Sequence, residues 1–207
     1  AISGWARDHL PDGEVVREAA TRAADLRGPH RHAALELLAG HLRKDPGLGL
    51  VRTLLELDRA SSDPSLDTLH EAARVALGLP DGAVLASQVL DTLYRKAARM
   101  WLHGEPTTGG LEPPSVAQWA LEQLIAQHLE AGHVEQAQHL LLDAARLPLE
   151  RQRALDLRRR AAELLAERGE RSRAIDVYRS VLDQSPGDLP MLQRLAELCE
   201  AEGRASE

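Results

Sequence analysis

A glycine-centred turn recurs near the C-terminal end of the chain. The stretches Ala166-Glu-Arg-Gly169-Glu-Arg and Ala201-Glu-Gly203-Arg place a glycine after similar residues, 34 positions apart. A fixed period of roughly 20 to 50 residues is typical of stacked helical repeats, in which each unit covers the hydrophobic face of its neighbour. Such an architecture favours a binding platform over a reaction centre.

The composition favours helices throughout the chain. Helix-forming Ala, Leu, Arg and Glu dominate and aromatic residues make up 2%, while an apolar content of 43% is enough for a sizeable core. The net charge of -7 gives no global attraction for nucleic acid or for an anionic membrane surface, so basic or neutral partners are favoured. Lys44 and Lys96 are the only lysines among 25 basic residues, a bias that is typical of a GC-rich bacterial coding sequence.

Cysteine usage and hydropathy bear on the compartment. Cys199 is the only cysteine, so the chain forms no intrachain disulfide and no thiolate metal cluster. There is no apolar run of about 18 residues and no signal-peptide pattern, which predicts a cytoplasmic protein. A periplasmic location stays open, because the first residue is Ala1 and a targeting segment would already have been removed.

Apolar residues in the second half recur at steps of three and four, which predicts amphipathic helices. Ser115 and Gln118 have the spacing of a capping box and follow two prolines, so we expect a helix to begin at residue 115. Turns are predicted at Gly132-His133, Leu147-Pro148, Gly169-Glu170 and Ser185-Pro186-Gly187-Asp188. Helices joined by such short turns pack antiparallel. Gly132 and Gly169 are 37 residues apart, three more than the next interval, which indicates extra residues in the connection from Leu147 to Arg151.

The first hundred residues are also predicted to be helical, but with irregular spacing. Gly- and Pro-containing breakers separate candidate helices near Asp12–Leu26, His30–Arg43, Gly49–Arg59, Ser65–Leu77 and Ala83–His103. The longest polar, Gly- and Pro-rich stretch covers residues 104–114. We therefore expect a repeat-like helical region over 1–103, a linker over 104–114 and regular repeats over 115–207.

The segment from about 115 to 207 resembles the tetratricopeptide repeat family, whose 34-residue units are helix-turn-helix hairpins. The clearest copy spans Leu155 to Asp188 and matches the family's small, turn, bulky and exit positions with Ala162, Gly169, Ala174, Tyr178, Val181 and Pro186. A following copy matches at Leu192, Leu195, Ala196 and Gly203, and a weaker preceding copy at Leu121, Leu124, Gly132, Ala137, Leu141, Ala144 and Pro148. The chain departs from the pattern at Arg158, where a large apolar residue is usual, and at Ile125, where a small one is usual.

The resemblance implies an all-α fold of antiparallel hairpins stacked into a right-handed superhelix. The 34-residue period places the counterpart of Ala174 at position 208, so the last hairpin is half present. Either the chain is a fragment of a longer array, or the helix from Leu189 to Glu202 is a terminal cap. Its wide apolar stripe favours a fragment.

Motifs for enzymatic chemistry are incomplete. His70-Glu71-Ala-Ala-Arg74 begins like a zinc-protease motif, but a cation replaces the second histidine. Glycines at 104 and 109 have the spacing of a phosphate loop, but Gly110-Leu111 follow where Lys and Ser or Thr are needed. His128 and His139 flank a turn and would be the candidate metal pair, although solvated histidines are the better interpretation. We expect no catalytic residue, no metal and no cofactor.

The basic cluster from Arg151 to Arg160 is interleaved with Asp156 and Glu163, which favours a salt-bridged helix face over a nucleic-acid site. In the resembled family, the first helix of each hairpin lines a concave groove. By that register the partner-binding residues are Trp119, Glu122, Arg159, Glu163, Gln193, Glu197 and Glu200. This groove would be mostly acidic, with Trp119 as an aromatic anchor.

These patterns predict a non-catalytic interaction scaffold that holds a peptide or a protein in its concave groove. The alternative is a structural spacer or a self-association module of a larger polypeptide. Neither nucleic acid nor a membrane is an expected partner.

Overall fold

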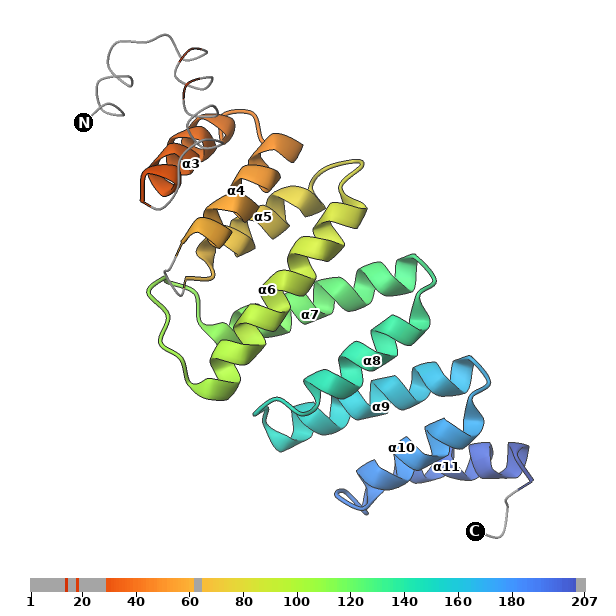
Figure 1. The fold of residues 1–207 in the computed structure, drawn as a ribbon. Coiled ribbons are helices and arrows are strands. Elements are labelled where there is room, and N and C mark those ends of the chain that lie inside the picture. Colours follow the sequence, from red (N-terminus) through yellow and green to blue (C-terminus); the bar gives the residue numbers. More distant parts are fainter. Residues whose placement is uncertain (1–13, 15–17, 19–28, 62–64, 204–207) are drawn as a thin grey trace. The chain divides into compact units, whose positions relative to one another are not determined.

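The described chain is entirely α-helical in its regular structure. The computed structural model describes residues 14, 18, 29–61 and 65–203. Figure 1 shows successive helices joined by short turns. The helices are α3 (Pro29–Leu42), α4 (Leu48–Ala60), α5 (Asp67–Leu77), α6 (Ala83–His103), α7 (Pro113–Glu130), α8 (Val134–Ala144), α9 (Arg151–Glu167), α10 (Arg171–Leu182) and α11 (Leu189–Ala201). The all-α prediction is confirmed. The helix predicted over Asp12–Leu26 lies outside the described residues apart from positions 14 and 18.

The start of α7 differs from the predicted one. The helix begins at Pro113, and the backbone N–H of Val116 donates to the carbonyl of Glu112 at 3.1 Å. Ser115 therefore lies inside the first turn, and the prediction that Ser115 and Gln118 form a capping box is wrong. Proline has a fixed φ and no N–H group, so it suits the first helical positions and starts the helix earlier than the serine would.

Contacts divide the chain into two compact units, residues 1–120 and 121–207, and the division falls within α7. In the first unit, α3 packs against α4, α4 against α5 and α5 against α6. The Lys96 ammonium lies 2.6 Å from the Asp58 carboxylate and ties α6 to α4. This pair is largely shielded from water, unlike most ion pairs of the chain.

The segment predicted as a linker joins α6 to α7 within the first unit. It is non-helical over residues 104–112, and Gly109 lies against the start of α5. A side chain at Gly109 would collide with the Asp67 carboxylate and the Ser65 hydroxyl. The domain limits at 104–114 stay a prediction, since the contact-defined division lies a few residues later.

In the second unit, three glycines end their helices in the same way. Gly132, Gly169 and Gly203 have φ angles of 73°, 79° and 73°, the left-handed region that only glycine adopts without strain. Each glycine N–H donates at 3.0 Å to the carbonyl three residues earlier. The next residue's N–H closes the turn after Gly132 and Gly169, at 2.7 and 2.9 Å from the carbonyls of His128 and Leu165. The glycine period therefore marks a repeated backbone turn.

The longer interval between the first two glycines has a different origin from the predicted one. The α8–α9 connection spans residues 145–150 and the α10–α11 connection spans 183–188, so both have six residues. The prediction of extra residues in the Leu147–Arg151 connection is wrong. Instead α9 has 17 residues against 13 in α11, while α8 has 11 against 12 in α10, which accounts for the difference of three. The added residues form an extra turn at the start of α9.

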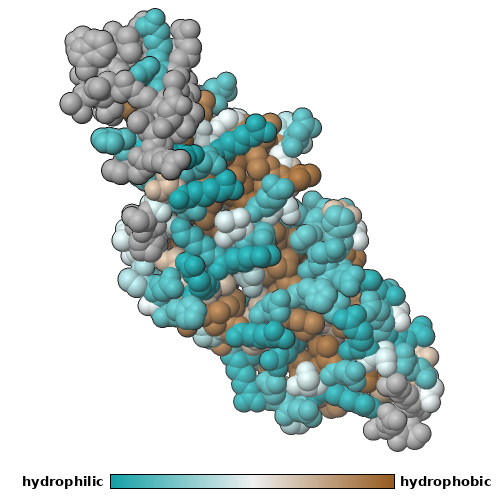
Figure 2. All heavy atoms as spheres, in the orientation of Figure 1, coloured by the Kyte–Doolittle hydropathy of each residue, from teal (hydrophilic) through white to brown (hydrophobic). Residues whose placement is uncertain are grey.

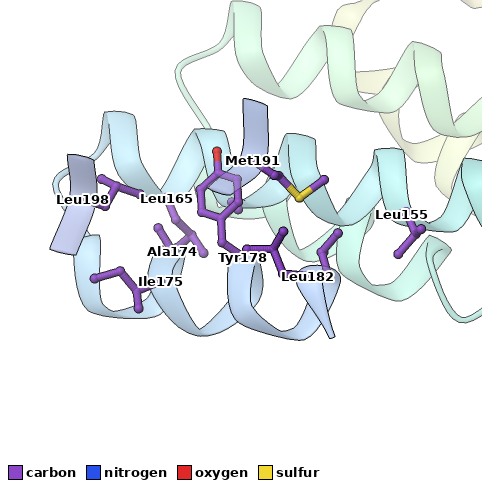
Figure 3. Packing of buried hydrophobic residues seen from close by; sticks show 10 residues of the cluster. Leu155, Leu165, Ala174, Ile175, Tyr178, Leu182, Met191 and Leu198 are labelled. Atoms are coloured by element: carbon purple, nitrogen blue, oxygen red, sulfur yellow. The ribbon is translucent and has the colours of Figure 1, made fainter. Parts of the chain in front are cut away.

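The core of the second unit joins three helices. Helix α9 packs against α8 and α10, and α10 against α11. Figure 3 shows the Tyr178 ring projecting from α10 toward Leu165 of α9 and Met191 of α11. The ring is 1% exposed and is among the largest fully buried side chains of the described chain. The complete cluster consists of Leu155, Ala162, Leu165, Ala174, Ile175, Tyr178, Val181, Leu182, Met191 and Leu198.

The surface is mainly hydrophilic. Figure 2 shows charged and polar residues over much of the visible face, with hydrophobic residues showing between them. Large apolar side chains that are exposed are few among the described residues, namely Leu48, Val84, Leu102, Leu189 and Leu192. None of the described helices has the length and apolar character needed to cross a bilayer.

Candidate functional site

The second unit contains a groove between α7 and α9, the first helices of two successive hairpins. Its volume is about 330 Å³. Its floor is apolar, because Leu121, Ile125 and Leu157 lie at the bottom and are each less than 7% exposed. The charged side chains that border it are Glu122, Arg153, Asp156, Arg159, Arg160 and Glu163. We call this site the α7–α9 groove.

One ion pair spans the groove from helix to helix. The Arg153 guanidinium of α9 donates to the Glu122 carboxylate of α7 at 2.6 Å. Both side chains are about half exposed, so the pair contributes on the order of 0 to 1 kcal/mol to stability. Its main consequence is geometric, because it places a basic and an acidic group side by side on the rim of the groove.

A second set of pairs runs along α9. The Arg159 guanidinium lies 3.6 Å from the Asp156 carboxylate and 3.9 Å from the Glu163 carboxylate. One arginine thus lies between two carboxylates on consecutive turns of the helix, as the interleaved sequence indicated, and the three groups together keep one negative charge. These pairs hold the three side chains along the rim of the groove.

The extra turn of α9 supplies Arg153. In the 34-residue register, the first residue of α11, Leu189, corresponds to Leu155, so residues 151–154 are the added turn. Arg153 lies in this turn and reaches Glu122 from there. Arg151 in the same turn donates to the backbone carbonyl of Gln184 in the α10–α11 connection. The departure from the regular period is therefore what brings a basic group opposite α7.

The structure brings three of the predicted partner-binding residues together and leaves four elsewhere. Glu122, Arg159 and Glu163 all border the α7–α9 groove. Three others are exposed on α11 and do not line it, namely Gln193, Glu197 and Glu200. On that helix the Glu197 carboxylate is paired with the Arg194 guanidinium at 2.8 Å.

Trp119 lies on α7 but belongs to the first unit. It is half-buried, and its ring meets the His70 imidazole edge-on with 4.6 Å between the ring centroids. Burial lowers the pKa of His70 below its usual value of 6.5, and the nearby Arg74 cation acts in the same direction. The histidine of the incomplete zinc-protease pattern is thus packed against a tryptophan.

Sequence reasoning missed the groove residues Arg153, Asp156 and Arg160. The predicted surface was mostly acidic, whereas the α7–α9 groove has three carboxylates and three guanidiniums. For Arg153 the available signal was the interval from Gly132 to Gly169, which is three residues longer than the interval from Gly169 to Gly203. For Asp156 and Arg160 the signal was their spacing from Arg153 and from each other, which places them on one helix face.

Tyr178 of α10 packs against Leu165 of α9 and Met191 of α11. Burial raises the pKa of its hydroxyl above the usual 10.0, and the Glu163 carboxylate adds to the effect, while the Arg194 guanidinium opposes it. The groups that influence Tyr178 include Arg159.

The histidines around the Gly132 turn do not form a metal-binding cluster. The rings of His128 and His133 are 6.0 Å apart, and His139 lies 4.0 Å from Glu135 on its own helix. Within residues 29–61 and 65–203, no group of three or more His, Cys, Asp or Glu side chains has the geometry to hold a metal ion.

Comparison with known proteins agrees with this geometry. No curated protein and no solved structure matches the chain. A family model described as "Tetratricopeptide repeat" matches residues 155–198, which cover most of α9 and α11 and all of α10. The stretch that contains the Tyr178 core is therefore similar to a tetratricopeptide repeat, and the added turn of α9 at residues 151–154 lies outside the match.

Proposed function

We propose that this protein is a non-catalytic scaffold that binds a peptide or an extended segment of another protein in the α7–α9 groove. The observation that carries the proposal is the groove itself. It lies between the first helices of two hairpins and has a buried apolar floor and charged rims. A leucine-sized side chain would contact the floor while the partner's backbone and polar groups meet the rims.

The rims are held in place before any partner arrives. Arg153 is paired with Glu122, and Arg159 with Asp156 and Glu163, so few side chains need to be ordered on binding. Preorganisation reduces the entropic cost of association and lets a small contact area give useful affinity. The general role of the matched repeat as an interaction module agrees with this arrangement. The predicted absence of enzymatic activity, cofactor, nucleic acid and membrane partners belongs to the same proposal.

A peptide-display experiment tests the groove. Short random peptides are selected on the wild-type chain, and their affinities are then measured for a groove-blocking variant, Glu122→Trp. Glu122 is exposed, so the indole fits without disturbing the core and occupies part of the groove. Glu167→Trp is the matched control, because Glu167 is exposed on α9 and does not line the groove.

We expect the selected peptides to lose at least about tenfold in affinity for Glu122→Trp and to bind Glu167→Trp as they bind the wild type. Circular dichroism of both variants confirms that the helices are retained. Equal affinity for all three proteins would refute the groove as the binding site.

A second candidate function, self-association, is favoured by one face of α11. Leu189 is 74% exposed, whereas its counterpart one repeat earlier, Leu155, is 4% exposed within the core cluster. A second copy that covered this face would bury Leu189 and Leu192. Light scattering of the wild type and of a Leu189→Ser, Leu192→Ser double variant tests it. A dimer that becomes a monomer supports self-association, and a wild type that is monomeric at high concentration refutes it.

A further inference from the structure

The charged rim of the α7–α9 groove contains one basic side chain that has no ion-pair partner among the described residues. Arg153 is paired with Glu122, and Arg159 with Asp156 and Glu163. Arg160 borders the same groove, and no ion pair or hydrogen bond of its side chain is found within the part of the chain that the structure describes. A guanidinium stays charged at any physiological pH, so Arg160 offers an unpaired cation to a ligand, although the three guanidiniums and three carboxylates of the rim sum to zero charge.

From this arrangement we infer that the partner is an extended peptide segment that places an acidic side chain, Glu or Asp, on Arg160 and an apolar side chain on the groove floor. The inference rests on the proposed function and names the chemistry of its ligand. A carboxylate matches the planar guanidinium, with which it forms two parallel hydrogen bonds. The floor of Leu121, Ile125 and Leu157 lies in the same groove as Arg160, so one short segment reaches both features.

Other ionic ligands match Arg160 less well. A lysine or arginine side chain at this point would meet the positive charge of Arg160. A phosphate group carries nearly two negative charges and would approach the carboxylates of Asp156 and Glu163, which lie within one helical turn of Arg160. A single carboxylate carries one negative charge, so these two carboxylates repel it less than they repel a phosphate while it pairs with Arg160. The proposed partner differs from the basic or neutral partners expected from the net charge of -7.

Fluorescein-labelled peptide pools test the inference. All pools carry random Leu, Ala and Ser, and they differ only in one central residue, which is Glu, Gln or Lys. Fluorescence anisotropy gives the affinity of each pool for the wild type, for Arg160→Gln and for Arg158→Gln. Arg158 is the matched control, because it lies on the same helix and, like Arg160, has no side-chain partner among the described residues, but it does not line the groove.

We expect the wild type and Arg158→Gln to bind the Glu pool about tenfold more tightly than the Gln pool, and the Lys pool most weakly. Arg160→Gln should lose the preference for Glu over Gln while it keeps its affinity for the Gln pool. An equal preference in Arg160→Gln and the wild type, or tighter binding of the Lys pool, would overturn the inference alone. If no pool binds in a way that Glu122→Trp weakens, the proposed groove function itself fails.

Discussion

Replacing Gln138 by leucine should stabilise the second unit. Gln138 lies on the inner face of α8 and is 1% exposed. Neither its side-chain nitrogen nor its side-chain oxygen has a hydrogen-bond partner among the described residues, and both atoms are buried. A buried polar group without a partner costs about 1 to 3 kcal/mol. Leucine has a similar volume and no polar atoms, so Gln138→Leu should raise the free energy of unfolding by about 1 to 3 kcal/mol.

Thermal unfolding followed by circular dichroism measures the effect. For a chain of this size each kcal/mol raises the melting temperature by roughly 2 to 4 °C. Hydrogen exchange of the α8 backbone amides locates the gain, because local opening of this helix should become rarer. Gln136→Leu is the matched control, since Gln136 is exposed on the same helix and its replacement removes no buried amide. A melting temperature of Gln138→Leu equal to or below that of the wild type would show that the amide is satisfied in the folded protein.

Three further perturbations have defined outcomes. Gly169→Ala forces alanine into a φ of 79° and should lower the free energy of unfolding in urea by about 1 to 2 kcal/mol. Gly40→Ala, within α3 and in open space, should raise it by about 0.5 to 1 kcal/mol. A Gly169→Ala variant more stable than Gly40→Ala would contradict the turn assignment. The pKa of His70 is lowered in the folded state, so the unfolded chain binds the proton first and stability should fall as the pH drops below 6.5. An NMR titration that gives His70 a pKa of 6.5 or higher would refute this prediction. The pKa of Tyr178 is raised in the folded state, so stability should be lost as the pH rises above 10.0. Ultraviolet titration of a Tyr94→Phe variant reports on the Tyr178 hydroxyl alone. Ionisation of this hydroxyl at a pH of 10.0 or below would contradict its burial.

Local rules were sufficient for the helices and the repeated turn. Glycine after a helical pattern predicted the turns at Gly132 and Gly169, and both have the left-handed geometry that makes glycine necessary. The spacing of these glycines also showed that three extra residues were present, but it could not show where. Residues 151–154 are Arg, Gln, Arg and Ala, which all favour helix, so they extend α9 instead of the connection.

The candidate site was less accessible to sequence reasoning. The repeat register pointed to Glu122, Arg159 and Glu163, because residues at equivalent positions of successive first helices face the same side. It could not predict that Arg153 pairs with Glu122 across the groove, since that contact depends on the extra helical turn and on how closely α7 approaches α9. The sequence also could not predict that the buried amide of Gln138 lacks a hydrogen-bond partner, because a glutamine between apolar positions does not indicate whether a partner lies nearby.

A partner bound between α7 and α9 is the central claim about this protein. A crystal structure of the chain with a peptide selected by display tests this claim directly. We expect the peptide to run along the α7–α9 groove, with a carboxylate on Arg160 and an apolar side chain against Ile125 and Leu157. A peptide bound instead to the second helices of the hairpins, α8 and α10, with an empty groove, would contradict the account.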